Sequence, residues 1–175
     1  MKNLIQYLPL THPKATMRFM KRLNNAGVMS ILDLEDSAQD PFDEAKTSEL
    51  KISSRNNFLE IAQNTSWKSE DFQLPIFVRV NDMSTSFFEE DIKTIIEISK
   101  TKFPISGIFL PKVSTYEDIT QTFDLLSFAD HPIEIVPMIE TKVGMENLEG
   151  SLGDPGVAVV RFFVSFWMYW WVVRL

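Results

Sequence analysis

Five short apolar runs along the chain predict β-strands. They begin near residues 4, 28, 76, 107 and 133, and each continues for five to seven residues with few polar interruptions. Near-continuous apolar runs of this length are typical of strands that are buried on both faces. The chain therefore predicts a parallel sheet that other elements cover.

Between these runs the apolar residues recur at helical spacing. Phe88, Ile92 and Ile95, for example, fall on one face of a helix. Gly27 is placed to end an earlier helix, because glycine readily adopts the left-handed conformation that often follows the last helical turn. The same spacing predicts helices at 14–26, 43–63, 87–100, 115–128 and 143–152.

Strands and helices thus alternate along the chain, which is the pattern of an α/β protein with a parallel sheet. The alternation fits both an open doubly wound sheet and a (β/α)8 barrel. In either architecture the functional residues gather at the carboxyl ends of the strands, where the loops to the helices begin. The chain has no low-complexity linker, so we expect one α/β domain.

The composition narrows the function classes. With 175 residues, 45% of them apolar, the chain can form one domain with a sizeable core. A net charge of −7 argues against a nucleic-acid-binding protein, which needs a basic surface. The absence of cysteine excludes disulfides and thiolate metal sites, and two histidines are too few for a multi-histidine zinc site. No secretory signal is visible, so we expect a cytoplasmic protein.

Every predicted strand ends in polar or charged residues. A single residue of this kind has an ordinary explanation: Asp36 can cap a helix, and Lys112 can be a solvated lysine. That explanation becomes weaker for all five strand ends together. In chain order, these ends carry Thr11 and His12, Glu35 and Asp36, Arg79 and Asn81, Lys112, and Glu140.

Arg79 is especially informative because it lies between two valines in an apolar strand. Burial of a guanidinium is costly unless it meets an anion. That anion is either a substrate carboxylate or oxyanion, bound in a bidentate manner, or one of the protein's own carboxylates. Glu35, Asp36 and Glu140 also suit a hard cation such as Mg²⁺, held by one or two carboxylates, waters and the substrate. His12 is either an acid–base group or a hydrogen-bonded loop histidine.

Four motifs together resemble the HpcH/HpaI aldolase and citrate lyase β-subunit family. They are LDLEDS at 32–37, VRVN at 78–81, LPKV at 110–113 and IET at 139–141, followed by Gly144 and Asn147. The resemblance implies a (β/α)8 TIM barrel of the phosphoenolpyruvate/pyruvate type. It also implies a Mg²⁺-dependent carbon–carbon lyase of the aldol or Claisen type. The expected substrate is a 3-hydroxy acid or its CoA thioester, such as citryl-CoA or malyl-CoA, and the expected assembly is a homo-oligomer, either a trimer or a hexamer.

The resemblance also assigns roles to individual residues. The substrate-binding arginine of the family falls on Arg79, and its metal-ligating glutamate, which also contacts the substrate, falls on Glu140. Asp36 is expected among the catalytic residues, and Glu35 and Lys112 among those that bind substrate. Glu35 and Asp36 would support the metal through a bound water.

The end of the chain departs from the family pattern. A second metal ligand, an aspartate, is expected near 164–168, but no carboxylate follows Asp154. We therefore interpret 1–160 as an incomplete barrel of five to six units and 161–175 as a divergent aromatic tail. The tail is a sixth strand, an anchor in contact with a membrane surface, or, as we favour, a frameshifted or truncated end.

This departure leaves two alternatives to the lyase. The first is a catalytically inactive member of the family that acts as a binding or interaction protein. The second is a CoA-independent aldolase of oxo acids.

Overall fold

A parallel six-stranded sheet forms the centre of the molecule. The computed structural model describes residues 4–64, 72–147 and 163–164. The strands are β1 (Leu4–Pro9), β2 (Val28–Asp33), β3 (Ile76–Arg79), β4 (Ile105–Leu110), β5 (Glu134–Ile139) and β6 (Phe163–Val164). The helices are α1 (Pro13–Asn25), the 3₁₀ turn η1 (Asp36–Ala38), α2 (Glu44–Ala62), α3 (Phe87–Ser99), α4 (Tyr116–Leu126) and α5 (Lys142–Asn147).

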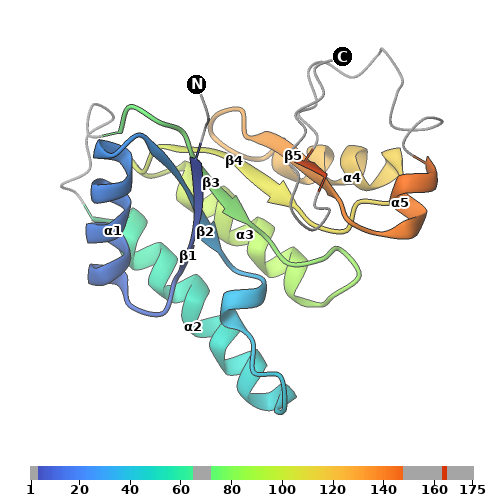
Figure 1. Ribbon diagram of the computed structural model, residues 1–175, viewed down its shortest axis with the longest axis horizontal. Helices are drawn as coiled ribbons and strands as arrows, with labels where there is room; N and C mark the ends of the chain where they lie inside the picture. The colour runs from blue at the N-terminus through green and yellow to red at the C-terminus, as the bar shows by residue number, and fades with distance from the viewer. Residues whose placement is uncertain (1–3, 65–71, 148–162, 165–175) are drawn as a thin grey trace.

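The five predicted strands and the alternation with helices are confirmed. The strands lie in the sheet in chain order, from β1 to β6, and every neighbouring pair is parallel. A doubly wound sheet instead reverses its strand order at a switch point. Sequential order with right-handed crossovers places all the helices on one face, as in the wall of a barrel. Figure 1 shows α1, α2, α3 and α4 following one another around the strands in this way.

Side chains of the strands separate into two apolar clusters because successive residues point to opposite faces of a sheet. The cluster on the inner face, away from the helices, contains Ile31, Phe77, Phe109, Val136 and Met138. The rings of Phe77 and Phe109 meet edge to face with centroids 5.4 Å apart. The inner face is therefore apolar along most of each strand, up to the carboxyl ends.

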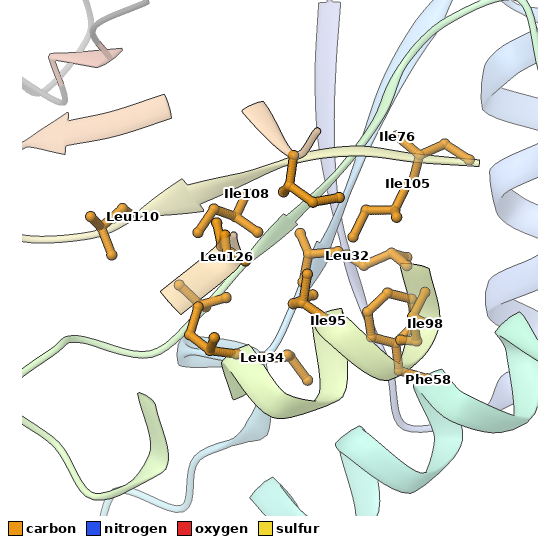
Figure 2. Close-up of a cluster of buried hydrophobic side chains, with 14 of the residues drawn as sticks. Leu32, Leu34, Phe58, Ile76, Ile95, Ile98, Ile105, Ile108, Leu110 and Leu126 are labelled. Atoms are coloured by element: carbon orange, nitrogen blue, oxygen red, sulfur yellow. The ribbon is translucent and has the colours of Figure 1, made fainter. Parts of the chain in front are cut away.

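The larger cluster lies between the sheet and the helices. Figure 2 shows Phe58 of α2 and Ile95 and Ile98 of α3 pointing toward the strand residues Leu32 and Ile105. All five side chains are buried. This packing fixes α2 and α3 on the sheet and orients the loops at their amino ends.

Local sequence signals set several helix boundaries. The Asp43 side chain accepts a hydrogen bond from the Lys46 amide at 3.1 Å and caps α2. Gly27 has a φ of 73° and ends the α1 connection in the left-handed conformation expected from the sequence. Helix α5 begins as predicted, and its described part ends at Asn147.

The aromatic tail is described only at β6. The backbone of Phe163 and Val164 pairs in parallel with Met138 and Ile139 of β5, as a sixth strand would. The interpretations of the tail as a frameshifted end or a membrane-surface anchor concern 161–175, of which 161–162 and 165–175 lie outside the described residues. The division at residue 160 also falls outside them. Among the described residues, no helix is both long enough and apolar enough to cross a membrane.

The core packing predicts the effect of removing one large side chain of α2. Phe58 is fully buried and contacts Phe103 edge to face, whereas Phe42, just before α2, is 96% exposed. We expect Phe58→Ala to lower the free energy of unfolding by about 3–5 kcal/mol, through lost burial and the cavity left behind. Phe42→Ala should change it by less than about 0.5 kcal/mol. Urea unfolding followed by circular dichroism measures both; equal effects would contradict the packing described.

Candidate functional site

The carboxyl ends of β2, β3, β4 and β5 bring their polar residues together at one edge of the sheet. The residues on this edge are Asp33, Glu35, Asp36, Arg79, Asp82, Lys112 and Glu140. Parallel strands in sequential order all end at the same edge, so residues far apart in the chain become neighbours. Five carboxylates and two cations meet here, which leaves an excess of negative charge.

The Arg79 guanidinium is the centre of this cluster. Its Nε and Nη2 donate to the two Asp33 oxygens at 2.9 and 2.7 Å, a bidentate pair across neighbouring strands. Its Nη1 lies 3.1 Å from Glu35 Oε2 and 2.9 Å from Asp36 Oδ2. The protein's own carboxylates therefore satisfy Arg79, as the second of the two sequence interpretations anticipated. Burial opposes protonation of Arg79, but these carboxylates outweigh it and raise the pKa of the guanidinium.

The ring of Tyr7, in β1, lies against the guanidinium of Arg79. Its ring centroid lies 4.7 Å from Arg79 Cζ, within cation–π range. Burial raises the pKa of Tyr7 to about 12, although Arg79 acts in the opposite direction. The phenol is therefore neutral at physiological pH, and the ring fixes the plane of Arg79 from the inner face of the sheet.

Glu35 links the two cations of the site. One of its oxygens contacts Arg79, and the other lies 3.4 Å from Lys112 Nζ. Lys112 also lies 3.4 Å from Asp82 Oδ2. Burial of Lys112 favours its neutral form, but Glu35 and Asp82 outweigh that effect and raise its pKa. Lys112 is therefore an ammonium ion held between two carboxylates rather than a freely solvated lysine.

The backbone of Lys112 positions Glu140. Lys112 has a φ of 54°, and among the described residues it is the only non-glycine residue with a positive φ. This left-handed conformation is strained for a residue with a Cβ. It directs the Lys112 amide toward Glu140, whose Oε1 accepts a hydrogen bond at 3.1 Å. The turn after β4 thus orients the carboxylate that ends β5.

Helix α5 holds this turn in place. A Cβ on Gly144 would lie 2.4 Å from the Val113 carbonyl oxygen, so only glycine allows the helix to approach the turn this closely. Asn147 Nδ2 donates to the Ser114 carbonyl oxygen at 3.0 Å, and the Ser114 and Thr141 hydroxyls lie 3.2 Å apart. The motif residues Gly144 and Asn147 therefore secure the loop that carries Lys112.

Desolvation dominates the titration of two carboxylates. Burial raises the pKa of Glu35 against the opposing effect of Arg79. Partial burial likewise raises the pKa of Glu140, against the hydrogen bond from the Lys112 amide and the charge of Arg79. Ionisation of either carboxylate therefore costs more free energy in the folded protein than in water. A nearby cation would lower that cost.

The oxygen ligands on this edge suit a hard divalent cation, but the available protein ligands are few. Within residues 4–64 and 72–147, no three Asp, Glu or His side chains are grouped closely enough to hold a metal ion. Asp33, Glu35 and Asp36 contact Arg79, and Asp82 pairs with Lys112, whereas Glu140 accepts a backbone hydrogen bond. Of these five carboxylates, Glu140 is therefore the one best placed to ligate a cation. Mg²⁺ is often held by one or two carboxylates, with waters and substrate as its other ligands. The position expected for the second ligand, 164–168, has no described side chains.

The structure brings together all five site residues proposed from the sequence, namely Glu35, Asp36, Arg79, Lys112 and Glu140. His12 is not among them: it lies exposed at the start of α1. The sequence interpretation missed Asp33, Tyr7 and Asp82. Strand alternation could have found Asp33 and Tyr7, because each has the same parity as an inner-face residue of its own strand.

The strained turn predicts an unusual order of stability at position 112. Glycine adopts a positive φ at little cost, whereas alanine pays about 1 kcal/mol there. We therefore expect Lys112→Gly to be more stable than Lys112→Ala by about 1 kcal/mol. Lys102 is exposed in a bend without a positive φ, so Lys102→Gly should be no more stable than Lys102→Ala. Urea unfolding of the four variants tests this, and the same order at both positions would contradict the turn geometry.

The raised pKa of Glu140 predicts a pH-dependent gain from neutralising it. Because the folded-state pKa lies above the ordinary value of 4.5, ionisation of Glu140 reduces stability. The reduction is complete above the folded-state pKa and disappears below about 4.5. Glu140→Gln should therefore melt at a higher temperature than the unsubstituted protein at pH 7, with a difference that shrinks as the pH falls. Glu49→Gln, on the exposed face of α2, is the control and should show no such trend.

Solved structures of other proteins share this fold. A citrate lyase from Burkholderia xenovorans superposes with a TM-score of 0.61 and 19% identity, covering 93% of this chain and 48% of that protein. The magnesium/glyoxylate complex of Haloferax volcanii malate synthase gives 0.62 and 15%, covering 87% and 47%. RipC from Yersinia pestis gives 0.56 and 19%, covering 93% and 58%. At these identities the likeness establishes the fold.

Sequence relatives point in the same direction. The human mitochondrial citramalyl-CoA lyase is 32% identical over 78 residues, 41% of this chain and 22% of that protein. A citrate lyase subunit beta-like protein of Deinococcus radiodurans is 26% identical over 132 residues, 75% of this chain and 42% of that protein. The chain thus matches less than half the length of either relative. The model of the HpcH/HpaI aldolase/citrate lyase family matches residues 7–162, and the chain belongs to that family.

Proposed function

We propose that the protein is a Mg²⁺-dependent carbon–carbon lyase that cleaves or forms a 3-hydroxy acid or its CoA thioester by aldol or Claisen chemistry. The observation that carries the proposal is the placement of Arg79 and Glu140 on one edge of the sheet, within a surplus of carboxylates. A cation can bind at such an edge because it offsets the excess negative charge. An anionic substrate can then bind beside it because the cation and Arg79 are both positive. The similarity to a citramalyl-CoA lyase favours the thioester over the free acid.

In this proposal Arg79 binds the carboxylate or carbonyl oxygens of the substrate. The bidentate pair with buried Asp33 stays in place and keeps the guanidinium oriented. The contact with Asp36 is the one that substrate replaces, because the Asp36 side chain is 69% exposed and free to swing into solvent. A fixed guanidinium stabilises negative charge that develops on the substrate oxygens as the carbon–carbon bond breaks.

Glu140 and Lys112 complete the proposed site. Glu140 would ligate the cation, and the amide of Lys112 holds one of its oxygens in position. When bound, Mg²⁺ would supply Lewis-acid polarisation of the substrate oxygens. The Lys112 ammonium lies on the same side and adds positive charge toward a substrate carboxylate or thioester oxygen.

Cleavage assays test the proposal directly. Malyl-CoA, citramalyl-CoA and citryl-CoA should be split in the presence of Mg²⁺, and a chelator should abolish the activity. Glu140→Ala and Arg79→Lys should each lower kcat/KM at least about a hundredfold, since a lysine cannot reproduce the bidentate fork. Glu49→Ala, remote on α2, should retain full activity. Each cleavage leaves the thioester intact in acetyl-CoA, so the assay follows the released 2-oxo acid as its phenylhydrazone.

Three outcomes would contradict parts of the proposal. Turnover of the free acids but not the thioesters would overturn the preference for the thioester and indicate a CoA-independent aldolase. No turnover of either substrate class, despite a folded protein, would indicate a non-catalytic family member. Unchanged rates in Glu140→Ala would show that the residue roles are wrong even if the reaction class is right.

A further inference from the structure

A fully buried lysine lies directly beneath the site. Lys51 projects from the middle of α2 and is only 3% exposed, with its ammonium 5.8 Å from the centroid of the Phe87 ring. Burying an ammonium costs free energy unless its donors are satisfied. Burial lowers the pKa of Lys51, while Asp91, Asp33, Glu35 and Asp36 all act to raise it.

The donors of Lys51 are satisfied by the loop that carries the acidic residues of the site. Its Nζ donates to the carbonyl oxygen of Leu34 at 2.8 Å and also to that of Glu35. These carbonyls follow directly on β2 and belong to the residues that lead into η1. Lys51 therefore ties α2 to the backbone segment from which Glu35 and Asp36 extend toward Arg79.

Asn81, which follows β3, also donates to the Leu34 carbonyl. Asn81 Nδ2 donates to the Leu34 carbonyl oxygen at 3.0 Å and to Asp91 Oδ2 at 2.7 Å. Asp91, which is 0% exposed, accepts a further hydrogen bond from the Asn81 amide and pairs with Arg55 at 3.0 Å. Arg55 is one turn beyond Lys51 on α2. The helix thus holds the ends of β2 and β3 through two cations.

We infer that Lys51, together with Asn81, Asp91 and Arg55, is a positioning network that sets the place of Glu35 and Asp36 relative to Arg79. The Lys51 side chain contacts neither the Arg79 guanidinium nor the side chain of any residue proposed to bind substrate. It acts through the backbone of the loop. The role in catalysis rests on the proposed function. The fixing of the loop does not.

Hydrogen exchange of the unsubstituted protein gives the first test. The amides of Glu35 and Ser37 donate to the Asp33 carboxylate at 3.0 and 3.1 Å, so they report directly on the loop. If the network fixes the loop, these amides exchange as slowly as those in the middle of α3 and with a similar dependence on denaturant. Exchange through a local opening that denaturant hardly affects would overturn the inference.

Substitution of Lys51 gives the second test. Lys51→Met keeps an unbranched apolar side chain, one atom shorter, but removes the donors. Lys46→Met is the control on the exposed part of the same helix. We expect Lys51→Met to speed exchange at Glu35 and Ser37 at least tenfold more than in the middle of α3. Uniform acceleration would indicate a purely global loss of stability and would overturn the inference. If Lys51→Met does not fold, the exchange of the unsubstituted protein still decides.

Activity distinguishes this inference from the proposed function. Lys51→Met should lower kcat at least tenfold at a temperature where the variant is folded, whereas Lys46→Met should not. Unchanged kcat with a loosened loop would overturn the catalytic role of the network. If the unsubstituted protein cleaves no thioester, the proposed function fails by itself, and hydrogen exchange still decides whether Lys51 fixes the loop.

Discussion

The guanidinium of Arg79, placed at the inner face of an otherwise apolar sheet, is the interaction on which the carboxyl edge depends. It draws Asp33 across from the neighbouring strand and Glu35 and Asp36 from the following loop. Without it, buried Asp33 would keep only the amides of Glu35 and Ser37, and Glu35 would keep only the Lys112 ammonium. Removing the partner of a buried charge costs several kcal/mol. The Tyr7 ring packs against the Arg79 guanidinium, and Lys112 pairs with Glu35.

Much of this arrangement follows from local patterns in the sequence. The apolar runs locate five strands to within about two residues, because a strand buried on both faces leaves an unambiguous signal. The strand ends then locate the site, since sequential parallel strands share one edge. Alternation adds a rule that would have found Asp33: it has the parity of Ile31, just as Arg79 has that of Phe77, so both side chains reach the inner face.

Other features depend on tertiary contacts that no local pattern reports. Lys51 lies on a helix rich in polar residues, where a lysine is normally solvated, and only the packing of α2 beside η1 buries it. The positive φ of Lys112 is equally hidden, because glycine or asparagine is the usual sign of that conformation. Both departures from local preference occur beside the proposed site, which is where such conflicts are expected.

The exposed contact between Asp36 and Arg79 has a consequence for selectivity. Asp36 is a carboxylate tethered to the protein within reach of the guanidinium, so its effective concentration there is far above that of a dilute anion in solution. In the proposed role of Arg79, an incoming carboxylate would have to compete with Asp36. A weak monoanion without other contacts would fail to displace it, whereas a ligand that also engaged Lys112 or a cation at Glu140 would succeed. The proposed site would thus select molecules by the number of attachments they make at the same time.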